Sequence, residues 1–265
     1  MTWLQVVVLA IVQGLTEFLP ISSSGHLVLV PAFFDWSDQG LAFDVAVHFG
    51  SLVAVCIFFR GDILALLRGG LQIARLNTDT LEARMALAIG VGTVPAAIAG
   101  LLLAGWIEAN LRSPAIIVFT LAGYGLLMAL ADRYGKRHRD ITNVRLSDAL
   151  LIGCAQALAL VPGTSRSGVT ITAARMLGFE RQNAARFSFV LSTPVILLAT
   201  VYKTWEMLTG EADVPWLQLG VGAAVAAVVA YISIDFFMRF VRRIGLLPFA
   251  AYRLVLAAVI LYVLV

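Results

Sequence analysis

Apolar runs of about membrane-spanning length dominate this chain of 265 residues and restrict its fold more than any other feature. A transmembrane helix needs about 20 consecutive, mostly apolar residues. Six runs of this kind occupy residues 43–59, 85–104, 114–131, 187–204, 216–237 and 247–264. Hydrophobic residues make up 60% of the chain and charged residues only 13%, about half the charged share of a soluble domain. The sequence therefore predicts an all-α polytopic membrane protein with six full transmembrane helices.

The positive charges gather in four polar stretches, and these set the expected orientation. They are residues 60–84, 133–145, 175–186 and 239–243. Cytoplasmic loops of membrane proteins carry an excess of Lys and Arg, so we place all four stretches in the cytoplasm. The breaks around Asp35 and Glu108 and at 206–213 are acidic or nearly neutral and are placed outside, as are both termini. The net charge of +3 is thus explained by topology, and no nucleic-acid partner is expected.

Three smaller features complete this frame. No Lys or Arg precedes Arg60, so the first apolar segment lacks the basic start of a signal peptide and is expected to remain in the mature protein. Cys56 and Cys154 lie singly in apolar runs, which predicts neither a disulfide nor a thiolate metal site. The small residues of "GVGAAVAAVVA", at 220–230, favour close helix packing within the chain or between chains, and a homo-oligomer therefore stays open.

Two further apolar segments do not fit the pattern of simple spans. Residues 149–174 run from one basic stretch to another, and residues 2–34 end at an acidic break without a preceding positive charge. Each is interrupted near its middle, by "VPGTSRSG" and "LPISSSGH" respectively. Helix-breaking polar backbone at membrane depth is tolerated only where it is buried in protein or lines a water-filled cavity. We therefore predict two re-entrant helical hairpins that enter from opposite sides.

The two hairpins are related by sequence. A shift of 143 residues pairs identical residues in five places: Gln13 with Gln156, Leu15 with Leu158, Ser22 with Ser165, Ser24 with Ser167 and Gly25 with Gly168. The opposite orientation predicts an inverted-topology repeat within a single membrane domain of residues 1–265. Repeat one is expected at about 1–131 and repeat two at about 149–265, joined by a basic cytoplasmic loop at 132–148. In such folds the functional site lies near the bilayer midplane, where the broken helices meet.

The chemistry at the two breaks is that of an anion site. Helices that begin at these serines would point backbone N–H groups and hydroxyls into one central volume. Arg166 lies among the serines, and a guanidinium suits phosphate oxygens well. Alternatively, Arg166 is neutralised by Glu17 and stabilises the fold, because a charge at membrane depth needs a partner. The predicted phosphate or diphosphate ligands are Gln13, Ser22, Ser24, Gly25, Gly163, Thr164, Ser165, Ser167 and Gly168.

Gln13 and Glu17 lie four residues apart, so they share one face of a helix. Their oxygens can serve as ligands of a hard cation, Mg²⁺ or Ca²⁺, with water and substrate phosphate completing the shell. The competing interpretation makes Glu17 a salt-bridge partner only. Asp44 and His48 are also four apart, and either line the same cavity or form a simple pair on one helix face.

A nucleophile and a proton-transfer group are also present. His26 follows the serine cluster and can move a proton to or from a phosphate oxygen. Ser23 is the predicted nucleophile with His26 as its base, because a serine hydroxyl is inert until a neighbour takes its proton. Ser22 and a metal-bound water remain alternative nucleophiles.

The motifs "QGLTEFLPISSSGH" and "PGTSRSG" and the tail "PFAAYRLVLAAVI" resemble those of the undecaprenyl-diphosphate phosphatases of the BacA type, over the whole chain. The resemblance implies hydrolysis of undecaprenyl diphosphate with a divalent cation, which recycles the lipid carrier of peptidoglycan synthesis and confers bacitracin resistance. It also implies a bacterial inner-membrane location with a periplasmic site. The family's glutamate motif falls on Gln13 and Glu17, its histidine on His26 and its arginine on Arg166. Because the first of these is an amide here, one carboxylate is expected near the cation.

A secondary transporter or flippase for a phosphorylated lipid is the alternative function, since inverted repeats with broken helices are typical of transporters. Transport requires recognition of charge but neither a base nor a nucleophile. The combination of Glu17, His26 and a serine cluster therefore favours the enzyme.

Overall fold

The computed structural model describes residues 1–111, 113–135, 138–209 and 215–264, and within them the regular secondary structure is helical, with one isolated β-bridge between Arg139 and Phe179. Lys136 and Arg137 of the predicted basic loop, and residues 210–213 of a predicted outside break, lie outside the described residues. The helices are α1 (Trp3–Thr16), α2 (Ser23–Phe33), α3 (Leu41–Phe58), α4 (Arg60–Ala74), α5 (Leu81–Asn110), α6 (Pro114–Tyr134), the 3₁₀ turn η1 (Ile141–Asn143), α7 (Leu146–Leu158), α8 (Arg166–Met176), α9 (Arg181–Thr209), α10 (Trp216–Arg243) and α11 (Leu247–Leu264).

Long apolar helices confirm a polytopic membrane protein. Within the described residues, α6, α9, α10 and the Leu81–Leu103 part of α5 are long and apolar enough to cross a bilayer. The pair α3 and α4 adds a fifth candidate span, with a bend of 88° at the break, and α11 is a shorter apolar helix. The helix α4 was not predicted, because its arginines mark the stretch as polar. Its leucines Leu64, Leu67 and Leu71 recur three and four residues apart, which is the period of an amphipathic helix.

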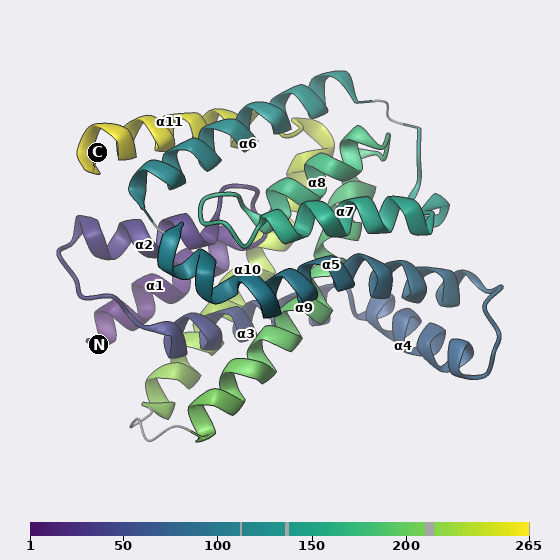
Figure 1. The fold of residues 1–265 in the computed structure, drawn as a ribbon, viewed down its shortest axis with the longest axis horizontal. Helices are drawn as coiled ribbons and strands as arrows, with labels where there is room; N and C mark the ends of the chain where they lie inside the picture. Colours follow the sequence, from purple (N-terminus) through teal and green to yellow (C-terminus); the bar gives the residue numbers. More distant parts are fainter. Residues whose placement is uncertain (112, 136–137, 210–214, 265) are drawn as a thin grey trace.

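Two pairs of short helices occupy the predicted hairpin segments. In Figure 1, α1 runs from the edge of the molecule that holds the N-terminus toward the centre, and α2 returns to that edge. The helix α7 runs inward from the opposite edge, and α8 returns there. The breaks at 17–22 and 159–165 are the tips of these hairpins, and the two tips point toward each other from opposite ends.

Glycines let each hairpin pack on a long helix from the other half of the chain. The helix α1 contacts α10, and α7 contacts α5. A Cβ atom on Gly14 would lie 2.8 Å from the carbonyl oxygen of Ala226, and one on Gly153 would lie 2.4 Å from that of Gly92. The predicted small-residue run therefore packs within the chain, against α1 and α3. This packing holds the two hairpin tips at the middle of the molecule.

Candidate functional site

The two hairpin tips have the same local structure. Ser22 caps α2 and Ser165 caps α8, and their hydroxyls accept the backbone N–H groups of Gly25 at 3.3 Å and Gly168 at 3.1 Å. Both serines have positive φ angles, 76° and 70°, a conformation that is costly for a residue with a side chain. The predicted helix starts are confirmed, and the relation between the repeats extends to the backbone.

The second serine of each tip repeats the relation and joins the tips. Ser24 and Ser167 each lie within hydrogen-bond distance of the capping serine hydroxyl, 3.3 Å away in both tips. The Ser167 hydroxyl also donates to the carbonyl oxygens of Glu17 and Leu19, at 3.3 and 3.1 Å. The two tips are therefore in direct contact, as expected for the halves of one site.

The turn before α8 depends on glycine. Gly163 has a φ of 85°, and a Cβ atom there would lie 2.2 Å from the Thr120 hydroxyl oxygen. That hydroxyl donates to the carbonyl of Pro162 at 2.7 Å, which ties the turn to α6. The neighbouring Thr164 is fully buried, and its hydroxyl has no hydrogen-bond partner among the described residues. Such an orphaned hydroxyl is consistent with the predicted ligand role of Thr164.

Arg253, on α11, holds both tips and was not predicted as a site residue. Its side chain is 1% exposed and donates to the carbonyls of Pro20 in the first tip, at 3.4 Å, and Gly163 in the second, at 3.0 Å. It also donates to the carbonyls of Thr120 and Leu121, both at 3.2 Å. The sequence does indicate Arg253, because an arginine within an apolar run is rare and marks a functional site or a buried partner.

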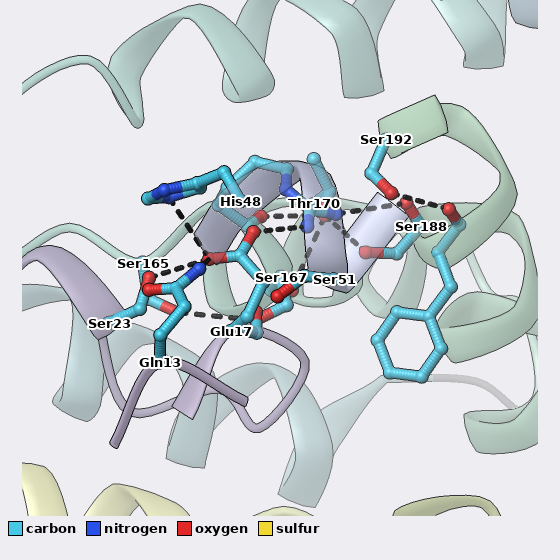
Figure 2. A network of polar contacts seen from close by, with 12 residues as sticks. Gln13, Glu17, Ser23, His48, Ser51, Ser165, Ser167, Thr170, Ser188 and Ser192 are labelled. Atoms are coloured by element: carbon cyan, nitrogen blue, oxygen red, sulfur yellow. Dashed lines mark hydrogen bonds and ion pairs between the residues drawn. The ribbon is translucent and has the colours of Figure 1, made fainter. Parts of the chain in front are cut away.

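Glu17 lies at the centre of the contacts between the tips (Figure 2). One carboxylate oxygen, Oε1, accepts from Arg166 Nη2 at 2.7 Å. The other, Oε2, accepts from the Ser23 hydroxyl at 2.7 Å and from Gln13 Nε2 at 3.1 Å. Four residues predicted as catalytic or cation-binding thus come together, and the ion pair between Glu17 and Arg166, which was the alternative interpretation of Arg166, is present.

Arg166 is fixed by more than its ion pair. Its Nη1 donates to the Ser188 carbonyl at 3.4 Å, and its guanidinium carbon lies 5.6 Å from the ring centre of Phe18. The Phe18 ring is fully buried and packs edge-on against Phe189, with 5.1 Å between centroids. These contacts orient the guanidinium, while 13% of its side chain remains exposed.

His26 has partners other than Ser23. Its Nδ1 lies 2.7 Å from the carbonyl oxygen of Ser22, and its Nε2 lies 2.7 Å from the Tyr252 hydroxyl. Because a carbonyl only accepts, Nδ1 carries the proton and Nε2 accepts from Tyr252. The structure therefore pairs the Ser23 hydroxyl with Glu17 rather than with His26. Tyr252 was not predicted, since it lies 226 residues from its partner in sequence.

His48, on α3, lies beside the same carboxylate. Its Nε2 is 3.5 Å from Glu17 Oε2, and its Nδ1 is 2.6 Å from the carbonyl oxygen of Asp44 (Figure 2 shows the imidazole next to Glu17). The Asp44 carboxylate accepts from Gln39 Nε2 at 2.8 Å. Of the two interpretations of Asp44 and His48, the structure favours a histidine that lines the central site.

The donor set at Glu17 fits a cation that is shared with a phosphate ligand. Oε1 of Gln13 is buried and has no hydrogen-bond partner among the described residues, although it lies on the side chain that contacts Glu17. Within those residues, no group of three or more His, Cys, Asp or Glu side chains is arranged to hold a metal alone. One carboxylate and one amide oxygen match a hard cation whose other ligands are water and phosphate.

Comparison with known proteins identifies a family that matches nearly the whole chain. The sequence model of the family described as "Bacitracin resistance protein BacA" matches residues 6–259. The protein named undecaprenyl-diphosphatase 2 of Stutzerimonas stutzeri (strain A1501) is 50% identical over 264 residues, which cover 98% of each chain. The undecaprenyl-diphosphatase of Hahella chejuensis (strain KCTC 2396) is 50% identical over 258 residues, 97% of each chain. That of Nitrosococcus oceani is 49% identical over 262 residues, 99% of each chain.

Proposed function

Because the chain belongs to the BacA family of bacitracin resistance proteins, we propose that it hydrolyses undecaprenyl diphosphate to undecaprenyl phosphate and inorganic phosphate. One observation supports this reaction most directly: the Ser23 hydroxyl donates to a buried carboxylate, Glu17, whose other oxygen is paired with Arg166. A nucleophile, a base and a cation for phosphate are thereby in contact at the meeting point of the tips. The product returns the lipid carrier to peptidoglycan synthesis and so supports bacitracin resistance.

The diphosphate is proposed to bind between the hairpin tips. The helices α2 and α8 begin at the two tips, so the N–H groups of their first turns lie beside the contact between the tips, and helix N-termini favour phosphate. Arg166 and the serine and threonine hydroxyls add donors at the same place. The polyprenyl tail lies against the apolar outer wall of the hairpins, where the repeat-related Leu15 and Leu158 are 44% and 49% exposed.

The first chemical step is attack by Ser23. Its oxygen forms a bond to the terminal phosphorus, its proton passes to Glu17, and the bridging P–O bond breaks to release undecaprenyl phosphate. Arg166 and the tip N–H groups stabilise the charge on the phosphoryl oxygens. Ser23 is preferred to Ser22, because the Ser22 hydroxyl accepts the Gly25 N–H as a helix cap.

The second step removes the phosphate from Ser23. Water attacks the phosphorus as the bond from phosphorus to Ser23 breaks, the Ser23 oxygen takes back the proton that Glu17 received in the first step, and the freed carboxylate accepts one proton of the water. In the first step, His26 is proposed to move a proton at the leaving oxygen of undecaprenyl phosphate through Nε2, since Nδ1 is held on the Ser22 carbonyl. Tyr252, which contacts that Nε2, orients the ring.

Glu17 and Gln13 are the proposed holders of Mg²⁺ or Ca²⁺, which when bound supplies positive charge beside the diphosphate. The orphaned oxygen of Gln13 supports this proposal. A carboxylate offers about four lone-pair sites, so Glu17 can serve a cation, Arg166 and Ser23 together.

The proposed membrane arrangement has six full spans and two re-entrant hairpins. The helices α3, α5, α6, α9, α10 and α11 coincide with the six predicted runs, which supports this count. The chain is proposed to lie in the bacterial inner membrane, with both termini and the entrance of the site on the periplasmic side. In Figure 1 the two termini lie at the same edge as the connection from α2 to α3, in agreement with this arrangement.

Phosphate release from the purified chain in detergent tests the function directly. Undecaprenyl diphosphate with Mg²⁺ or Ca²⁺ should release inorganic phosphate, and a rapid quench should trap phosphate on Ser23. Ser23→Ala should lose both signals. Full turnover by Ser23→Ala without a trapped intermediate would assign the attack to water, and no release from any polyprenyl diphosphate would favour the lipid transporter instead.

A further inference from the structure

In its neutral form, His48 presents a lone pair toward Glu17. Its Nδ1 is 2.6 Å from the Asp44 carbonyl oxygen, which can only accept, so Nδ1 carries the hydrogen of the neutral ring. Nε2 is then unprotonated, and it lies 3.5 Å from Glu17 Oε2. In that form two acceptor atoms face each other, and a cation placed between them would bind both.

The Gln13 amide can complete a set of three donor atoms. Its Nε2 now donates to Glu17 Oε2 at 3.1 Å, while its Oε1 is buried without a hydrogen-bond partner among the described residues. The two ends of an amide differ little in shape, and a half-turn exchanges them. After that exchange an oxygen takes the place beside Glu17 that the nitrogen holds now.

The spacing of the donors suits a metal ion. Neighbouring ligands of an octahedral cation with bonds of about 2.1 Å lie about 3 Å apart. The separations from Glu17 Oε2, 3.5 Å to His48 and 3.1 Å to Gln13, are close to that value. His48 is 33% exposed, so water and phosphate can reach the remaining positions. The Asp44 carbonyl holds the ring by its other nitrogen, as the outer partners of metal-binding histidines usually do.

We propose that His48 is a third protein ligand of the divalent cation held by Glu17 and Gln13, an inference that rests on the cation of the proposed function. A nitrogen ligand changes which ions the site prefers. Imidazole binds later transition metals more strongly than it binds Mg²⁺ or Ca²⁺. The site should therefore bind Mn²⁺ more tightly than a site with oxygen ligands alone.

Pulsed electron paramagnetic resonance with Mn²⁺ tests the ligand without reference to activity. A nitrogen ligand modulates the spin echo of bound Mn²⁺. The chain has three histidines, His26, His48 and His138, so substitution of each can show which imidazole causes this modulation. His48→Gln should abolish the modulation and weaken Mn²⁺ binding by at least about tenfold. His26→Gln and His138→Gln should keep the modulation, and Glu17→Gln should lose bound Mn²⁺.

A second variant protects the test against misfolding of His48→Gln. The double variant His26→Gln with His138→Gln leaves His48 as the sole imidazole, and its bound Mn²⁺ should still show modulation. Absence of modulation there, or its persistence in His48→Gln, overturns the proposal. If the chain shows modulation but releases no phosphate, His48 is a ligand and the proposed hydrolysis is wrong. If the chain releases phosphate but shows no modulation, the hydrolysis stands and His48 is not a ligand.

Discussion

Glu17 is a partner in a buried ion pair and the proposed base for Ser23, so its substitution should affect stability and turnover together. Glu17→Gln keeps the shape of the side chain but removes the charge that faces Arg166 and the proton acceptor of Ser23. Loss of a general base lowers turnover about 10²- to 10⁴-fold. Breaking a buried pair by removing one partner costs about 3–5 kcal/mol. Phosphate release and thermal unfolding in detergent should therefore both fall.

The matched control for Glu17 is an exposed ion pair. Asp235 bonds Arg239 four residues later on the surface of α10. Asp235→Asn should change stability by no more than about 1 kcal/mol and leave turnover as it is. Turnover of Glu17→Gln within tenfold of the native chain would remove Glu17 from the role of base.

Tyr252 is the proposed positioning residue for His26. Tyr252→Phe removes the hydroxyl 2.7 Å from His26 Nε2 but keeps the ring, which stacks on the imidazole with 5.8 Å between centroids. A hydrogen bond of about 1 kcal/mol corresponds to about a fivefold fall in kcat. KM should stay constant, and the pH profile of kcat should shift, because the nitrogen that exchanges protons loses its partner.

Tyr262→Phe, on the same helix, is the control for Tyr252→Phe. Tyr262 is 92% exposed, so its substitution should leave kcat and the pH profile as they are. Equal effects of the two substitutions would show that the hydroxyl of Tyr252 has no particular role.

At the residue scale, the sequence predicted those site residues that lie within the repeated motifs. Gln13, Glu17 and Ser23 share one short stretch, and Arg166 falls at the position related to Ser23 by the 143-residue shift. Tyr252 and Arg253 were missed, because their partners lie far away in sequence and spacing carries no information about such contacts. The sequence paired Ser23 with His26 as its base, whereas the Ser23 hydroxyl donates to Glu17 in the structure; helix spacing cannot tell which way a hydroxyl turns in a broken segment.

At the element scale, the breaks of the helices were readable because proline, glycine and serine interrupt apolar runs. The start of α2 at Ser23 and of α8 at Arg166 agrees with that interpretation. The helix α4 was missed because charge was the stronger signal there. The approach of α7 to α5 was not predicted, since a glycine in an apolar helix does not reveal its partner.

Substitution of Gly153 tests the close contact of α7 with α5, which supports the second hairpin. A Cβ atom there would meet three backbone atoms of Gly92 at 2.4–2.9 Å, and backbone cannot yield as a flexible side chain can. Gly153→Val should force α7 away from α5 at a cost of about 1–3 kcal/mol or more. The melting temperature should fall, and phosphate release should fall with it, since α7 leads into the tip with Ser165.

Gly90→Val is the matched control on α5. A Cβ atom on Gly90 meets no heavy atom within 4 Å, so this substitution adds the same side chain without a clash. Its melting temperature should equal or slightly exceed that of the native chain, because valine has the higher helix propensity. Equal destabilisation by both substitutions would contradict the role assigned to the close approach.

At the scale of the whole molecule, the two halves of the chain are interleaved. The helix α1 packs on α10 and α7 on α5, so each hairpin is supported by the opposite half. Arg253 of α11 bonds carbonyls of both tips. Neither half presents a complete site, since Glu17 and Ser23 come from one and Arg166 from the other. The charge pattern predicts how this assembly lies in the membrane, whereas contacts between the halves required the structure.

Labelling of single cysteines in intact cells tests the orientation of the whole assembly. Ser37 and Thr78 are exposed residues on the α2–α3 and α4–α5 connections, which lie at opposite edges in Figure 1. Arg75 and Arg84 flank Thr78, whereas two aspartates, Asp35 and Asp38, flank Ser37. Loops that carry Lys and Arg are retained in the cytoplasm. In a chain with Cys56 and Cys154 replaced by alanine, a membrane-impermeant maleimide should therefore label Ser37→Cys in cells with a permeable outer membrane. Thr78→Cys should react only after lysis, and the reverse pattern would place the N-terminus and the first hairpin on the cytoplasmic side.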